Sequence, residues 1–204
     1  MGRILIILSG LAVLWIGISE LQLRWESRSE PTEYSLAALE EGAAVSNLNG
    51  RLDSHWALFD AMVFTYQTRR GKPPEENDTV SGYCYPVVSK LPAAPGENLE
   101  FRVVVRDHRA RKVSDLPSGV EKQPAVSGLF LRGVKGKDRE LLQAGFPHVD
   151  FHKVLLFEVG RKKKTVWDLL FCFLAGPALI YGAVRFKKTE KVKVTRIDNR
   201  SPGV

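Results

Sequence analysis

The sequence is poor in cysteine. Among 204 residues there are two, Cys84 near the middle and Cys172 in an apolar stretch near the C-terminus. Small exported domains with little core depend on several disulfides, so the chain does not belong to that class. If Cys172 lies in a membrane, the two thiols cannot pair, and we expect Cys84 to be a small buried hydrophobe between two tyrosines. The alternatives for Cys84 are a bridge to another chain and a redox thiol.

The motifs of the common enzyme classes are missing as well. The sequence has no Gly-rich phosphate loop ending in Lys-Ser/Thr, no Gly-x-Ser-x-Gly, no His-Glu-x-x-His, no Cys-x-x-Cys and no dinucleotide fingerprint. Asp53, Ser54 and His55 have the residue types of a hydrolase triad, but adjacent residues cannot face one another as that mechanism requires. We therefore expect a protein that is not an enzyme and holds no cofactor. An enzyme whose site is assembled from scattered loop residues is the alternative.

Positive charge is concentrated in two places. The formal net charge is +7, yet residues 20–160 carry about as many acidic as basic residues. The excess lies in residues 161–164 and 185–204, on the two sides of the second apolar stretch. Basic residues in such a position are attracted to anionic lipid headgroups. We therefore expect the lipid bilayer as a partner and no nucleic acid.

Two stretches, residues 4–19 and 166–184, are strongly apolar and almost free of charge. About 20 residues of helix match the roughly 30 Å hydrocarbon core of a bilayer. The sequence therefore predicts two terminal transmembrane helices, and a cleaved signal peptide is the alternative for the first. The residues expected to anchor the helices at the membrane surface are aromatic or basic: Trp15, Trp25, Lys162, Lys163, Lys164, Trp167, Arg185, Lys187 and Lys188.

These stretches divide the chain into four parts. The predicted parts are an N-terminal anchor over residues 1–25, a domain over 26–160, a second span with basic flanks over 161–186, and a basic tail over 187–204. The basic start, Met1-Gly2-Arg3, favours an amino end in the cytoplasm. Two spans then return the tail to the cytoplasm and leave the domain outside it. We expect a multi-pass protein of the cell inner or plasma membrane.

The domain between the anchors is expected to be mainly β-structure. Short stretches rich in β-branched and aromatic residues predict strands at residues 43–52, 57–66, 83–88, 99–105, 126–134 and 149–159. Segments rich in proline, glycine or charge predict loops at residues 68–82, 90–98 and 107–124. Two short helices are predicted at residues 35–41 and 138–144, each followed by a glycine suited to a left-handed cap. The fold class is thus a membrane protein with two terminal transmembrane helices flanking a small antiparallel barrel or sandwich with one or two short helices.

One cluster of metal-binding residue types occurs in the last predicted strand. The period of two in a strand would place His148, Asp150 and His152 on one face. Two imidazoles and a carboxylate are suitable ligands for a divalent metal. Alternate residues on a strand are nevertheless about 6.5 to 7 Å apart, so the alternatives are a solvated strand face and a contact with a partner.

The arrangement of terminal spans around a β domain is similar to that of the surfeit-type respiratory-chain assembly proteins. The similarity is one of architecture, and no functional residue is carried over from it. Anchors at both ends of the domain hold it close to the bilayer and raise its effective concentration for membrane neighbours. We therefore expect a non-catalytic protein whose β domain docks on other membrane proteins as an assembly, accessory or scaffold subunit, of any oligomeric state. The alternatives are a membrane-tethered sensor or ligand/lipid-binding module and a metal-dependent enzyme that uses the strand with His148.

Overall fold

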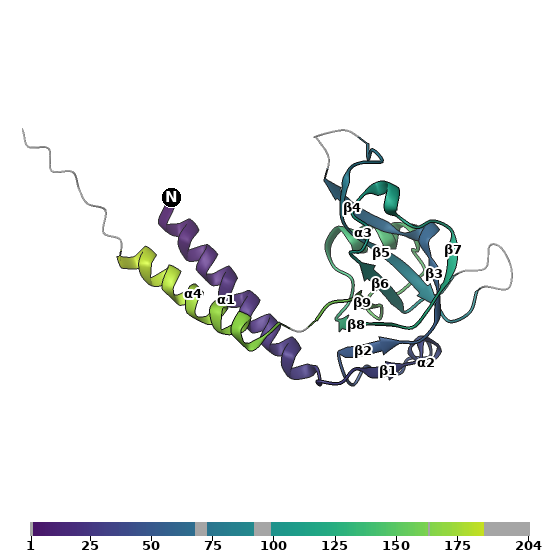
Figure 1. Ribbon diagram of the computed structural model, residues 1–204, viewed down its shortest axis with the longest axis horizontal. Coiled ribbons are helices and arrows are strands. Elements are labelled where there is room, and N and C mark those ends of the chain that lie inside the picture. Colours follow the sequence, from purple (N-terminus) through teal and green to yellow (C-terminus); the bar gives the residue numbers. More distant parts are fainter. Residues whose placement is uncertain (1, 68–72, 92–98, 163, 186–204) are drawn as a thin grey trace, which may run out of the picture. The chain divides into compact units, whose positions relative to one another are not determined.

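The computed structural model describes residues 2–67, 73–91, 99–162 and 164–185 (Figure 1). The chain divides into two compact units. The helical unit consists of Met1–Glu20 and Thr165–Val204, and the β domain is Leu21–Lys164. The predicted tail over residues 187–204 lies outside the described residues.

Two helices are long and apolar enough to cross a membrane. Helix α1 spans Gly2–Glu26 and helix α4 spans Val166–Arg185. At 1.5 Å per residue each reaches about 30 Å or more, the thickness of a hydrocarbon core. Both apolar stretches are therefore helical as predicted, and α1 continues beyond its apolar stretch to include Trp25.

Glycines allow α1 and α4 to pack closely within the helical unit. A Cβ atom on Gly10 would lie 2.7 Å from Cγ1 of Ile180 and 2.9 Å from the backbone oxygen of Gly176. A Cβ atom on Gly176 would lie 2.6 Å from Cγ of Leu14. Small residues are typical of helix contacts in lipid, where close packing takes the place of the hydrophobic effect.

In the described part of the chain, nine strands of the β domain form one curled sheet (Figure 1). The strands are β1 Thr32–Tyr34, β2 Asn49–Leu52, β3 His55–Leu58, β4 Val63–Gln67, β5 Thr79–Val88, β6 Val103–Asp107, β7 Val120–Gln123, β8 Val126–Leu131 and β9 Leu155–Val159. Their order in the sheet is β1-β2-β8-β9-β6-β5-β3-β7, and β4 also pairs with β5.

The sheet is a half-barrel of mixed direction, which corrects the prediction of a small antiparallel barrel or sandwich. Strands β1 and β2 are parallel, and so are β6 and β9. Parallel neighbours need a crossover, which here is the chain from β6 through β7, β8 and helix α3 (Gly136–Gly145) to β9. The pattern of apolar residues indicates strands but not their direction, and for this reason the sequence did not reveal the parallel pairs.

Side chains from six strands converge inside the curl. Phe130 of β8 and Phe157 of β9 lie at its centre with ring centroids 4.7 Å apart, and Tyr85 of β5 joins the same buried cluster. Helix α2, Leu36–Glu40, contributes Leu36 and Leu39 to this cluster. The inside of the half-barrel is therefore a packed hydrophobic core.

The outer face of the central strands is buried as well. Val104 of β6 and Leu156 of β9 face this second cluster, which α3 covers with Leu142. Phe101 and Phe151, on the segments before β6 and β9, complete the cover. Burial of both faces explains why the sequence of these strands is a continuous apolar run.

Most predicted elements exist, but several boundaries differ. The stretch 57–66 is divided into β3 and β4 by a 3₁₀ turn at Phe59–Ala61, and a second such turn lies at Val113–Asp115. The first half of β5 and all of β7 lie in segments predicted as loops, and β1 was not predicted. Gly42 has a φ of 104°, which confirms the left-handed residue after α2. The same expectation for Gly145 is wrong, because that residue lies inside α3.

Candidate functional site

The predicted metal cluster is not on a strand. Residues 148–153 form turns before β9, so the period-two argument fails, and each side chain has its own partner. Nε2 of His148 lies 2.8 Å from the backbone oxygen of Leu99. Asp150 pairs with Lys153 at 3.1 Å, and His152 contacts Arg139 at 3.3 Å. In the described part of the chain, no three His, Cys, Asp or Glu side chains are grouped to hold a metal ion.

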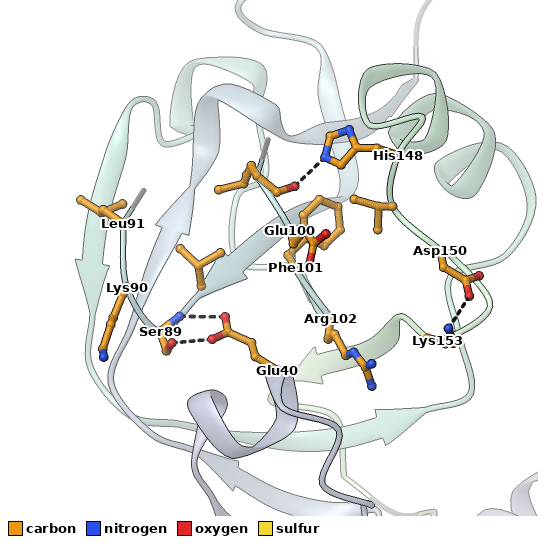
Figure 2. Close-up of a pocket in the computed structure, with 13 residues that line it drawn as sticks. Glu40, Ser89, Lys90, Leu91, Glu100, Phe101, Arg102, His148, Asp150 and Lys153 are labelled. Atoms are coloured by element: carbon orange, nitrogen blue, oxygen red, sulfur yellow. Dashed lines mark hydrogen bonds and ion pairs between the residues drawn. The ribbon is translucent and has the colours of Figure 1, made fainter. Parts of the chain in front are cut away.

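The same turns line an open cavity of about 680 Å³, which we call the rim pocket (Figure 2). Its walls are residues 88–91 after β5, residues 99–102 before β6, residues 148–153 before β9, and Glu40 of α2. Val88 and Phe101 give the pocket an apolar floor. Its volume is in the range of small-molecule sites.

Charged side chains surround this floor. Glu40 accepts hydrogen bonds from the backbone nitrogen and the hydroxyl of Ser89, which fixes α2 to the end of β5. Arg102 lies between Glu40 and Lys153 in Figure 2, and among the described residues it makes no ion pair. A Cβ atom on Gly42 would lie 3.3 Å from Nη1 of Arg102, so glycine at position 42 leaves room for the guanidinium. The pocket can therefore bind a carboxylate through Arg102 and an apolar group on its floor.

A second polar cluster holds the end of α1 against the β domain. Nη1 of Arg24 donates to the backbone oxygen of Lys164 at 3.1 Å, and Nη2 of Arg132 pairs with Glu26 at 3.0 Å. We call Arg24, Glu26, Arg132 and Lys164 the α1 clasp. It joins the two points at which the β domain connects to the apolar helices.

The predicted anchoring residues are described in part. Trp15, Trp25 and Trp167 are exposed on the helices, Trp15 near the middle of α1 and the other two near helix ends. Lys162, Lys164 and Arg185 are described, and the guanidinium of Arg185 lies 5.3 Å from the ring centroid of Tyr181. Lys163, Lys187 and Lys188 lie outside the described residues.

Asp168, near the start of α4, caps its helix. Its carboxylate accepts hydrogen bonds from the backbone nitrogen and the hydroxyl of Thr165, at 3.0 and 2.8 Å. The hydroxyl of Thr165 in turn accepts from the backbone nitrogen of Asp168 at 3.3 Å. This reciprocal capping box satisfies the helix end and gives the carboxylate a structural role.

Cys84 belongs to a buried polar network that the sequence did not indicate. The thiol is 2 % exposed, and burial raises its pKa to about 11 although Arg106 opposes that shift. Nε of Arg106 lies 3.3 Å from the sulfur, and Nη2 of Arg106 pairs with Asp138 of α3 at 2.6 Å. The network fixes α3 to the sheet and keeps the thiol protonated and unreactive at neutral pH.

Comparison with protein-family models, curated proteins and solved structures finds no match to this chain. Sequence reasoning missed the rim pocket and the role of Arg132, because both depend on contacts between segments far apart in the chain. A pocket lined by residues from four separate segments leaves no signature in local periodicity.

Proposed function

We propose that this chain is a non-catalytic two-pass membrane protein whose β domain lies outside the cytoplasm and docks on other membrane proteins as an assembly, accessory or scaffold subunit. The observation that carries the proposal is the α1 clasp, because Arg24–Lys164 joins the two connections to the apolar helices and Glu26–Arg132 fixes the first of them to the segment after β8. A domain with two short tethers stays near the bilayer. Its effective concentration for membrane neighbours is then high, whereas soluble partners gain nothing from the tethers.

The packing inside the half-barrel favours docking over lipid binding in the barrel. Phe130, Phe157, Leu36 and Leu39 are each 1 % exposed or less and fill the inside of the curl. A lipid chain would have to displace this core. Contacts on the outer surface and edges of the β domain therefore account better for an interaction.

Strand β4 is the edge best suited to pair with a partner. Its residues Val-Phe-Thr-Tyr-Gln carry no charge, and among the described strands it pairs with β5 alone. The other edges, β1 and β7, contain charged residues, which discourage pairing with a further strand. A partner strand would add its backbone hydrogen bonds to β4 and contact the rings of Phe64 and Tyr66, whose centroids are 5.7 Å apart.

The test is affinity purification of the full-length chain in mild detergent, followed by mass spectrometry. Thr65→Lys places a charge on exposed β4, and Val120→Lys makes the same change on the exposed edge strand β7 as a matched control. We expect membrane proteins to co-purify with the parent and with Val120→Lys but not with Thr65→Lys. Purification of the parent as a folded monomer without membrane proteins would contradict the docking proposal.

Membrane insertion is tested separately. We expect alkaline carbonate to leave the full-length chain in membrane vesicles, because α1 and α4 would each bury an apolar span. Protease should reach the β domain from the outer side of the membrane only. Release by carbonate, or cleavage of the β domain from the cytoplasmic side, would contradict this part of the proposal.

The rim pocket favours a second candidate function, a tethered ligand-binding module. Arg102 beside an apolar floor is suited to a carboxylate with a hydrocarbon tail. Hexanoate serves as a probe of this chemistry: it should raise the Tm of the full-length chain, but not that of Arg102→Gln. Arg51→Gln, which changes an exposed arginine paired with Glu33, is the control. Equal shifts in all three chains would exclude Arg102 from binding.

A further inference from the structure

The last turn of α1 combines an exposed tryptophan with arginines from two parts of the β domain. Trp25 is 88 % exposed, although it lies between two residues that contact the domain. Arg24, on one side of the turn, reaches Lys164, and Glu26, on the other, pairs with Arg132 from the segment after β8. Tryptophan rings favour the interface between hydrocarbon and water, so this turn is suited to the headgroup level of a bilayer.

Two arginines belong to this turn or contact it. Arg24 belongs to it and donates to the backbone oxygen of Lys164, and Arg132 pairs with Glu26. Two further basic residues, Arg161 and Lys162, come shortly before Lys164 in the sequence, and Arg161 pairs with Glu158 at 2.7 Å. The side chain of Arg132 is also 78 % exposed, so N–H donors beyond the one that pairs with Glu26 are open to solvent.

We infer that the last turn of α1, with Trp25, Arg24 and Arg132, binds the headgroup of an anionic phospholipid. The inference rests on the membrane insertion in the proposed function, and it adds a lipid class and a site. The guanidinium of Arg132 is planar and suited to hold a phosphate through two hydrogen bonds while Glu26 sets its direction. The site lies wholly within Leu21–Lys164.

The experiment measures lipid binding by the full-length chain in neutral detergent micelles. Phosphatidylglycerol and phosphatidylcholine with identical acyl chains are titrated separately, and native mass spectrometry counts the bound lipids. Arg132→Gln should weaken binding of phosphatidylglycerol about fivefold and leave phosphatidylcholine unchanged, since one cation beside the headgroup is lost. Binding of phosphatidylglycerol to the parent should also weaken as salt is raised.

Glu26→Gln separates headgroup binding from a purely structural role of the ion pair. If Arg132 binds the phosphate, removal of the competing carboxylate of Glu26 should leave binding of phosphatidylglycerol equal or stronger. Arg51→Gln, in an exposed ion pair elsewhere in the domain, should have no effect.

Three results would overturn the inference. These are equal affinity of the parent for both lipids, parallel losses in Arg132→Gln and Glu26→Gln, and an equal loss in Arg51→Gln. Failure of the proposed function is distinguishable, because carbonate would then release the chain from membranes. A chain that stays in the membrane but shows no lipid preference refutes only this inference.

Discussion

Lowering the pH is expected to destabilise the β domain through His55. Its side chain is 1 % exposed, Nδ1 lies 2.8 Å from the backbone oxygen of Asp53, and Nε2 has no hydrogen-bond partner among the described residues. Burial lowers the pKa of His55, although Asp53 opposes that shift. The cause is the loss of hydration that a charged imidazolium would suffer in the core.

The sign and size of the effect follow from proton binding. In the unfolded chain a histidine titrates near pH 6.5. Below that pH the unfolded chain binds a proton that folded His55 does not accept until its own, lower pKa is reached. The free energy of unfolding therefore falls as the pH decreases below about 6.5, by at most about 1.4 kcal/mol per pH unit for this one group.

Urea unfolding of the full-length chain in neutral detergent, at pH 7.5 and pH 5.0, measures this effect. Trp56, the neighbour of His55 on β3, reports unfolding when the other three tryptophans are replaced by phenylalanine. His55→Asn retains a donor for the Asp53 oxygen and removes the titrating ring, so it should lose less stability than the parent between the two pH values. His152→Asn, which changes an exposed histidine, should behave like the parent. Equal losses in the parent and His55→Asn would refute the reasoning.

Three further changes test close packing and burial. Gly128→Ala should cost about 1–3 kcal/mol and lower the urea midpoint, because its Cβ would clash with the backbone oxygen of the neighbouring β9. Cys84 should resist alkylation by maleimide at pH 7.5 until urea unfolds the domain, because burial raises the pKa of its thiol to about 11. Rapid labelling of Cys84 in the folded chain would contradict this prediction. Gly17→Cys should form a disulfide with Cys172 under mild oxidation, because the two Cβ atoms would be 3.0 Å apart and need to separate only slightly. Leu11→Cys, on the exposed side of α1, should form no disulfide with Cys172.

The sequence predicted the elements that depend on local pattern. The two apolar helices and the short helices α2 and α3 appear close to their predicted residues. Gly42 marks the end of α2 because a left-handed residue is needed there. The buried environment of Cys84 was also predicted, from its apolar neighbours.

Features that depend on distant pairing were not predicted. Val149 and Phe151 are apolar and alternate with polar residues, as in a strand, yet they lie in turns and pack against β6 and β9. The neighbouring residues His148, Asp150 and His152 are therefore not aligned on one face of a strand, as the sequence had predicted. Strand β7 is charged and short, and only its pairing with β3 makes it a strand. A period-two pattern in the sequence does not indicate which strand will pair with which.

The place of β9 in the sheet has a consequence for biosynthesis. This strand is the last of those described, but it lies between β8 and β6 and joins the group β1-β2-β8 to the group β6-β5-β3-β7. A nascent chain that has not yet released Leu155–Val159 from the ribosome or the translocation channel holds two separate half-sheets with open edges. Completion of the domain must therefore wait until almost all of it has been synthesised, and nascent chains stopped before β9 should remain sensitive to protease.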